Sequence, residues 1–422
     1  MADESILTDE FLRQLIDVGE ADVLVGVPTY NNAATVGQVV QAIRAGLLKY
    51  FPRERAVIVN ADGGSRDSTS DLVRGASIND LQHSTDLKAL RTLHSISAEY
   101  AGGPATGTAL RTILASAELL RVSACAVVSP ESTTIEPEWI ERLLRPVYKG
   151  NYDFVTPLYR RHKFDGLLMS NLVYPMTRAF YGKRVREPYA AEFSFSGQLA
   201  SHFLGQEIWT HEVGQTGTEI ALTISAITGG FRLAQSFLGD KPRADARSAD
   251  LVDAMRQTVG AMFWSLEPNV SLWSANGQSQ TIPTLCEGQE VTLEPLRINR
   301  KRLFDMFRSG VAELKPVLES ILSPVTLSEL QGIAALDEDN FAYGDELWAR
   351  TVYEFAASYH KAVISRDHVV QALAPLYRGR AFTFLVQNRE ASAEQVEQNI
   401  ENFCLTCERL KPSLLEMWNG RK

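Results

Sequence analysis

The chain has 422 residues, of which 45% are apolar and 22% charged, and at roughly 150 residues per domain it holds two or three domains. These proportions exclude a disulfide-stapled miniprotein, an intrinsically disordered chain and a fibrous protein. The net charge of -9 argues against broad attraction to nucleic acid or to anionic lipid.

Strands and helices alternate through the first half of the chain. An amphipathic helix is predicted in the first 20 residues, followed by buried strands at 23–27, 56–60, 124–129 and 152–156. Helical patterns lie between and after them, at 34–50, 68–74, 108–121 and from Pro137 onward. This rhythm predicts an α/β, doubly wound, Rossmann-like sheet whose ligand site lies at the carboxyl ends of the strands.

The second half of the chain reads as mostly helical. Helices are predicted at 165–181, 219–228 and 250–266, and a further strand at 231–237. Residues 274–294 are polar and rich in turn residues, so a domain boundary is expected near 275–295. The prediction is a first domain at 1–275 with its core at 20–245, and an α-helical domain at 295–422.

Two further features of the sequence bear on the cellular location of the protein and on the redox state of its cysteines. No apolar run reaches the ~20 residues that span a bilayer, and the first ten residues are acidic where a signal peptide would be basic and apolar. The four cysteines fit a reducing compartment, and Cys404 and Cys407 lie in a helical pattern that favours a packed core over a metal site. These features predict a cytoplasmic protein.

Polar loops follow the first two predicted strands. The first loop is Pro28-Thr29-Tyr30-Asn31-Asn32, and the second runs from Asn60 to Thr69 through Asp62-Gly63-Gly64-Ser65. Glycines permit a tight turn beside a ligand, and an aspartate can accept hydrogen bonds from a nucleobase or a ribose. A plain strand-to-helix turn with its cap explains the second loop equally well.

Together these loops resemble those of the family-2-like glycosyltransferases of the GT-A fold, with their P-x-Y-N and D-x-G-S-x-D-x-T elements. The resemblance extends over roughly residues 20–245 and is greatest to the glucosyl-3-phosphoglycerate synthase and mannosylglycerate synthase type. Its further motifs are Pro104 to Leu110, Ser129-Pro130-Glu131-Ser132, Pro137-Glu138-Trp139-Ile140, Ala190-Ala191-Glu192-Phe193 and Gly217-Thr218-Glu219-Ile220.

The resemblance implies transfer of a hexose from a nucleotide-diphosphate sugar. The residues that it places at the sugar nucleotide are Pro28, Thr29, Tyr30, Asn31, Asp62, Gly64, Thr106 and Lys241. Those that it places at the reaction are Glu131, Glu192, Glu219 and Arg243. The family also uses a divalent cation, held by a D-x-D motif and a late histidine, to neutralise the leaving diphosphate.

The sequence departs from the family at the charged residues and metal ligands that the family uses at the diphosphate. Ser129-Pro130-Glu131 replaces D-x-D, Thr106 replaces a lysine, and Arg243 stands where the histidine is expected. Two explanations stay open: Glu131 alone binds Mg²⁺ or Mn²⁺, or Lys241 or Arg243 replaces the metal. A third is that catalysis has been lost.

Glu192 and Glu219 are the candidates for the acceptor side. The alternative for Glu192 is a salt bridge, and the alternative for Glu219 is a solvated or helix-capping role. The basic stretch Tyr159-Arg160-Arg161-His162-Lys163, with Lys183, Arg184 and Arg186, suits an anionic acceptor or a solvated face. The resulting prediction is a glycosyltransferase acting on a small polar or anionic acceptor of the glycerate or phosphoglycerate type. Its rivals are a nucleotide-sugar-binding pseudoenzyme and a structural partner protein. The synthase-type relatives further imply a homodimer.

Overall fold

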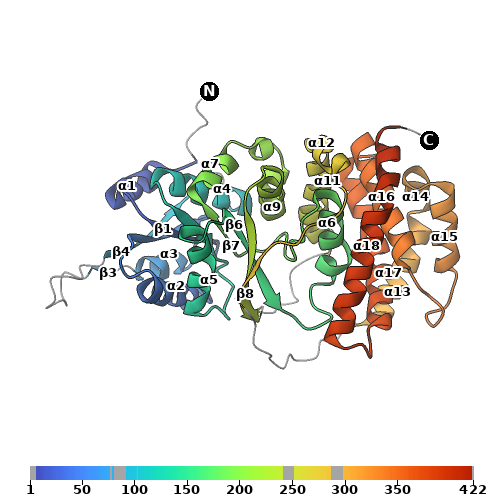
Figure 1. Ribbon diagram of the computed structural model, residues 1–422, viewed down its shortest axis with the longest axis horizontal. Coiled ribbons are helices and arrows are strands. Elements are labelled where there is room, and N and C mark those ends of the chain that lie inside the picture. Colours follow the sequence, from blue (N-terminus) through green and yellow to red (C-terminus); the bar gives the residue numbers. More distant parts are fainter. Residues whose placement is uncertain are drawn as a thin grey trace. The chain divides into compact units, whose positions relative to one another are not determined.

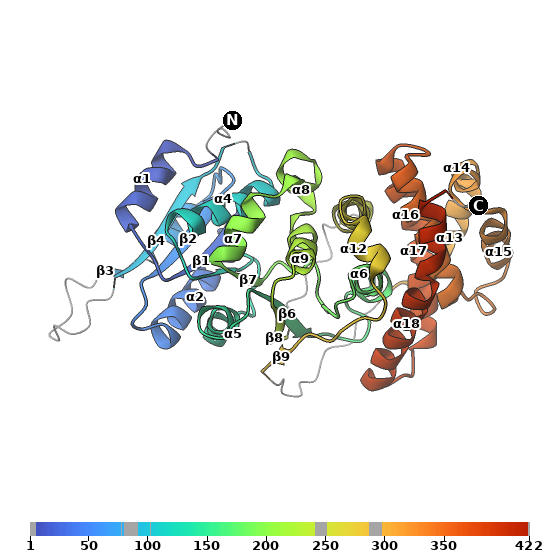
Figure 2. The same cartoon turned by 45° about the horizontal axis from the view of Figure 1, so that its top comes forward.

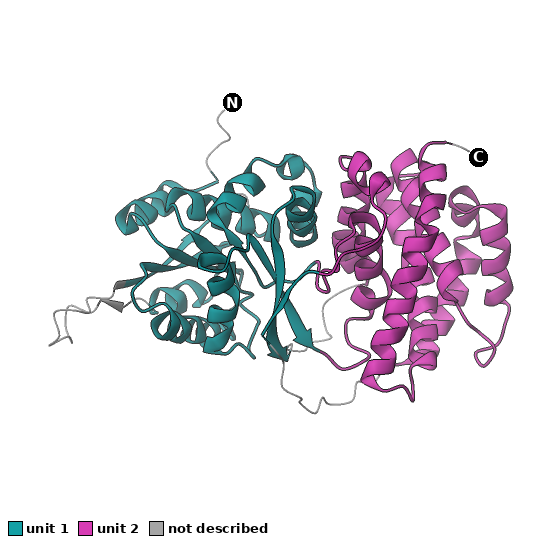
Figure 3. Ribbon diagram, viewed as in Figure 1, with its two compact units in different colours: residues 1–160, 189–244, 282–290 teal, residues 161–188, 245–281, 291–422 magenta. Residues whose placement is uncertain are grey.

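The computed structural model describes residues 6–76, 78–79, 92–101, 103–240, 251–286 and 298–420. The chain divides into two compact units (Figure 3). The first unit contains residues 1–160, 189–244 and 282–290, and the second contains residues 161–188, 245–281 and 291–422. The chain therefore enters and leaves each unit more than once.

A mixed sheet forms the centre of the first unit. Its described strands lie in the order β3-β4-β2-β1-β5-β7-β6-β8-β9 (Figure 1). They are β1 (Val23–Thr29), β2 (Ala56–Asp62), β3 (Ile78–Asn79), β4 (Thr92–Glu99), β5 (Ala124–Val127), β6 (Phe154–Arg160), β7 (Phe193–Ser196), β8 (Leu233–Asp240) and β9 (Thr284–Leu285). Only β3 and β7 run antiparallel to their neighbours among these strands. The predicted doubly wound sheet is confirmed.

Helices cover both faces of this sheet (Figure 2). They are α1 (Asp9–Val18), α2 (Val36–Tyr50), α3 (Thr69–Arg74), α4 (Thr106–Leu119), α5 (Pro137–Tyr148), α7 (Gly197–Leu204), η3 (Glu207–Thr210), α8 (Val213–Thr216) and α9 (Thr218–Thr228). On one face, Ile43 of α2 and Trp139 of α5 share a core with Val25 of β1. On the other face α4 packs so closely that a Cβ at Gly26 would lie 2.4 Å from Ile113.

The sequence patterns predict neither β4 nor β7, because both contain serines at buried positions. Ser194 of β7 donates its hydroxyl to the Leu143 carbonyl at 2.6 Å, and Ser95 of β4 donates to the Val73 carbonyl at 2.6 Å. A buried hydroxyl that is hydrogen-bonded costs little, so these strands tolerate a polar composition.

Helices form the second unit. They are η2 (Met169–Val173), α6 (Tyr174–Tyr181), α10 (Leu251–Met255), η4 (Arg256–Gly260), α11 (Ala261–Leu266), α12 (Val270–Ala275), α13 (Arg300–Glu313), α14 (Lys315–Ile321), α15 (Pro324–Ala334), α16 (Asp345–Lys361), α17 (Arg366–Gln387) and α18 (Ala393–Trp418). The predicted helices at 165–181 and 250–266 each contain a π-helical turn, η2 and η4. None of the helices in the described part of the chain is both long and apolar enough to cross a membrane.

The division into units differs from the domain boundary expected near 275–295, because residues 161–188 and 245–281 belong to the helical unit. Aromatic packing explains the difference. The Phe180 ring of α6 lies 6.4 Å from that of Trp273 in α12 and 6.0 Å from that of Tyr353 in α16. These segments thus share one core with the C-terminal helices, although they are far from them in sequence.

A fully buried arginine links α6 to α18 in this unit. The side chain of Arg178 is 0% exposed, and its guanidinium lies 2.5 Å from Glu401 and 2.7 Å from Glu408. The hydrogen bond from Arg178 holds the pKa of Glu401 below its usual value. A buried guanidinium needs such partners, because an unpaired buried charge costs several kcal/mol.

We expect Arg178→Met to destabilise the helical unit by about 3 kcal/mol or more, because Glu408 then keeps a largely buried charge without its partner. Urea unfolding followed by tryptophan fluorescence measures the loss. Arg409→Met is the matched control, since its pair with Glu346 is exposed and should contribute about 1 kcal/mol or less. Equal losses in the two variants would contradict the role given to Arg178.

Candidate functional site

The carboxyl ends of the parallel strands meet at one edge of the sheet. Thr29 ends β1, Asp62 ends β2 and Asp240 ends β8. Because β7 is antiparallel to β5 and β6, its amino end lies at the same edge, which brings Glu192 there directly before Phe193. The topology therefore gathers at this edge the polar loops that the sequence singles out.

Asp62 lies at the centre of a buried hydrogen-bond network. Its carboxylate is 4% exposed and accepts hydrogen bonds from the Thr29 hydroxyl at 3.0 Å and the Ser70 hydroxyl at 3.3 Å. Ser65 donates both its backbone N–H, at 2.9 Å, and its hydroxyl, at 2.6 Å. The carboxylate is thus fully used in holding the loops after β1 and β2 together.

The same two loops are joined by reciprocal contacts of Asn31. Its backbone N–H donates to the Ser65 hydroxyl at 2.8 Å, and its side-chain oxygen accepts from the Arg66 N–H at 2.9 Å. These contacts hold Asn31 at a φ of 56°, in the left-handed region that asparagine tolerates. Tyr30 beside it is 47% exposed, so its ring is free to stack on a flat ligand.

Gly64 and Thr106 complete this part of the edge. Gly64 has a φ of 84°, and a Cβ there would lie 2.8 Å from a carboxylate oxygen of Glu99, so a glycine is required. Thr106 begins α4 after Ala105, which supplies no side-chain cap. The first N–H groups of α4 therefore lack a capping side chain, as in helix ends that bind anions.

Glu192 is buried and held by two hydroxyl groups. It is 3% exposed, and its two carboxylate oxygens accept separately from the Ser132 hydroxyl and from the Tyr159 hydroxyl. Ser132 belongs to the Ser129-Pro130-Glu131-Ser132 motif, so two of the motifs that the sequence singles out contact each other. The sequence places Ser132 in one of the motifs of the resemblance and Tyr159 at the start of a basic stretch, but it assigns neither hydroxyl group a role beside Glu192.

Glu219 lies in the first turn of α9 and is partly buried. Burial raises the pKa of its carboxyl group from an ordinary value of 4.5 to about 6, and the negative charge of Glu192 adds to the rise. A carboxyl group with this pKa can take up and release a proton near neutral pH. The fold thus places Glu192 and Glu219, the two carboxylates predicted for the acceptor side, close enough for the charge of one to affect the pKa of the other.

Of the three residues predicted to converge on the diphosphate, the structure describes Glu131. Glu131 is exposed in the loop after β5, while Lys241 and Arg243 lie outside the described residues and stay predictions. The strand that precedes them does reach the Glu131 loop, since Thr134 donates its hydroxyl to the Asp240 carbonyl at 3.1 Å.

Most of the basic residues considered for an anionic acceptor are paired within the helical unit. Arg161 binds Glu187 at 2.7 Å, and Arg186 binds Glu397 at 3.0 Å. Lys163 donates to three backbone carbonyls, those of Asn388, Arg389 and Ala391. These charges therefore have structural partners in the unit that contains them.

A metal ion has few ligands to use at this edge. The described residues include no group of three or more His, Cys, Asp or Glu side chains placed to hold a metal. Glu131 offers one exposed carboxylate, and the carboxylates of Asp62 and Glu192 already accept hydrogen bonds from hydroxyl groups. This donor set does not fit the divalent cation that the sequence resemblance implies.

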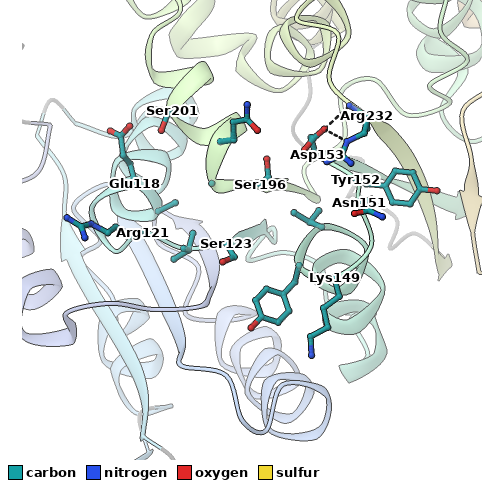
Figure 4. Close-up of a pocket in the computed structure, with 16 residues that line it drawn as sticks. Glu118, Arg121, Ser123, Lys149, Asn151, Tyr152, Asp153, Ser196, Ser201 and Arg232 are labelled. Atoms are coloured by element: carbon teal, nitrogen blue, oxygen red, sulfur yellow. Dashed lines mark hydrogen bonds and ion pairs between the residues drawn. The ribbon is translucent and has the colours of Figure 1, made fainter.

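A cleft of about 650 Å³ lies at the opposite, amino edge of the sheet (Figure 4). Ser123 and Asp153, which precede β5 and β6, line it with Ser196 at the end of β7. Arg232 pairs with Asp153 at 2.9 Å at one side of it (Figure 4). No residue predicted for the site is among the described residues that line this cleft.

No protein-family model and no curated protein matches the chain. Among solved structures it is similar to glucosyl-3-phosphoglycerate synthase from Mycobacterium tuberculosis in complex with Mn²⁺, UDP and glucosyl-3-phosphoglycerate. The identity is 18%, the match covers 63% of this chain and 86% of that chain, and the TM-score is 0.43. A second structure of the M. tuberculosis enzyme matches at 19% identity over 60% of this chain and 84% of that chain, with a TM-score of 0.42.

We expect Glu219→Gln to raise stability near neutral pH by about 1–2 kcal/mol. Between pH 4.5 and about 6 the folded chain keeps a proton that the unfolded chain has lost, so wild-type stability falls as the pH rises through this window. The glutamine variant should lack this fall. Urea unfolding at a series of pH values measures it, with the exposed Glu212→Gln as control; identical pH profiles for wild type and Glu219→Gln would contradict the assignment.

Proposed function

We propose that this chain is a glycosyltransferase that moves a hexose from a nucleotide-diphosphate sugar to a small polar or anionic acceptor, of the glycerate or phosphoglycerate type. The observation that carries the proposal is the joining of the two motif loops at the carboxyl edge, where Asn31 bonds Ser65 and Arg66 while Asp62 bonds Thr29. Neither motif is specific alone, but two motifs joined in space form a nucleotide cradle.

Each part of the sugar-nucleotide donor contacts its own residues in this cradle. Tyr30 stacks on the base, with Pro28 and Thr29 behind it, and Asp62 keeps both loops in place. The uncapped amino end of α4 at Thr106, with Gly64 allowing close approach of the backbone, receives the diphosphate. These roles rest on exposure, backbone conformation and hydrogen bonds within the first unit.

Glu219 and Glu192 divide the work on the acceptor side. Glu219, with a pKa of about 6, takes the proton of the acceptor hydroxyl group when the transfer inverts the anomeric carbon. Glu192 is held by Ser132 and Tyr159, so its charge stays fixed beside that reaction. A retaining transfer needs the two carboxylates only for positioning.

The second candidate is a nucleotide-sugar-binding pseudoenzyme. The exposure and isolation of Glu131, where the family has a pair of carboxylates, favour it. The rate of donor hydrolysis separates the two candidates, since an active transferase releases sugar from UDP-glucose or a related donor and a pseudoenzyme only binds it. Cytoplasmic location is part of the proposal, supported by four cysteines that are all free.

Replacing Asp62 with alanine should weaken nucleotide binding by about tenfold or more, because Thr29, Ser65 and Ser70 lose a charged acceptor. Calorimetry with UDP, GDP and ADP measures the change. The exposed Asp71→Ala in α3 is the matched control, and circular dichroism shows whether each variant is folded. An unchanged nucleotide affinity in a folded Asp62→Ala protein would contradict the proposal that these two loops bind the nucleotide.

A homodimer is also proposed, on the resemblance to synthase-type relatives. Sedimentation velocity of the full chain over a range of concentrations should give twice the monomer mass of 46.8 kDa. A mass that stays at the monomer value would reject the dimer and leave the proposed activity untouched.

A further inference from the structure

We infer that the nucleotide site binds its ligand without a divalent cation, the positive charge at the edge being supplied by the protein. The inference rests on the proposed function for its ligand, but its argument comes from the carboxylates at the carboxyl edge. A divalent cation such as Mg²⁺ or Mn²⁺ needs oxygen ligands with free lone pairs. Each carboxylate at this edge can be examined for them.

The segment from Ser129 to Ser132 presents little to a cation. Ser129 uses its hydroxyl oxygen to accept the backbone N–H of Glu131 at 3.2 Å, which closes a tight turn. Ser132 directs its hydroxyl to Glu192. The turn thus leaves Glu131 as its single carboxylate, exposed to solvent.

The buried carboxylates nearby are already satisfied. Glu192 accepts a hydroxyl on each oxygen, from Ser132 and Tyr159, and Asp62 accepts four hydrogen bonds from Thr29, Ser65 and Ser70. Asp62 has all of its acceptor sites in use, so to bind a metal it would have to release a donor and leave a buried polar group unpaired. That release costs about 1–3 kcal/mol for each group. Glu192 keeps one acceptor site on each oxygen beside its hydroxyl partner.

Asp240 is a further carboxylate beside this segment, and a cationic side chain, that of Arg160, belongs to the neighbouring strand. Arg160 is its register partner across β6 and β8. Arg160 Nη1 and Asp240 Oδ1 are buried, and neither has a hydrogen-bond partner among the described residues. A guanidinium stays charged at any physiological pH and repels a second cation, while its planar N–H groups suit phosphate oxygens.

Calorimetric titration of the full chain with UDP, GDP and ADP tests the inference, in buffer with excess EDTA and in buffer with excess Mn²⁺. We expect affinities that differ by less than about twofold between the two buffers. In Ser129→Asp, which restores two acidic residues at the family spacing, Mn²⁺ should strengthen binding by about tenfold or more. Ser129→Asn has the same size without the charge and should not respond to Mn²⁺.

Nucleotide binding by wild type that disappears in EDTA would overturn the inference. Mn²⁺ alone, followed by electron paramagnetic resonance, gives a readout that does not depend on nucleotide. Wild type should leave Mn²⁺ free, and Mn²⁺ binding that Glu131→Gln abolishes would overturn the inference even if no nucleotide binds. If neither Mn²⁺ nor any nucleotide binds, the proposed function fails while the absence of a cation site is upheld.

Discussion

The burial of carboxylates at the carboxyl edge of the sheet is the constraint on which the rest of the site depends. A buried carboxylate must receive hydrogen bonds, and in this chain serine, threonine and tyrosine hydroxyl groups provide them. Asp62 gathers donors from β1, from its own loop and from α3, so the two motif loops adopt one joint conformation. Glu192 does the same for the loop after β5 and the end of β6.

This constraint links two segments that look independent in the sequence. Ser132 follows β5 in the chain, and Glu192 directly precedes β7. In three dimensions the two segments meet through the hydrogen bond from Ser132 to Glu192. One set of hydrogen bonds therefore fixes both segments at the carboxyl edge.

In the helical unit a buried cation likewise requires partners. Arg178 has no exposed surface, and Glu401 and Glu408 neutralise it from α18. Aromatic rings from α6, α12 and α16 pack against one another in the same unit. Packing and charge pairing together draw residues 161–188 into the helical unit, although they lie between two strands of the sheet in sequence.

The sequence by itself determined the alternating elements, the doubly wound sheet and the polar loops at the strand ends, because apolar periodicity and glycine positions are local properties. It pointed to Asp62, Glu192 and Glu219 as candidates, but it did not pair Ser132 or Tyr159 with Glu192, since the fold alone brings these hydroxyl groups to that carboxylate. Only the tertiary structure decided that Arg161 and Lys163 are engaged in the helical unit and that Glu219 has a raised pKa. Both outcomes depend on burial and on partners distant in sequence, which no local pattern records.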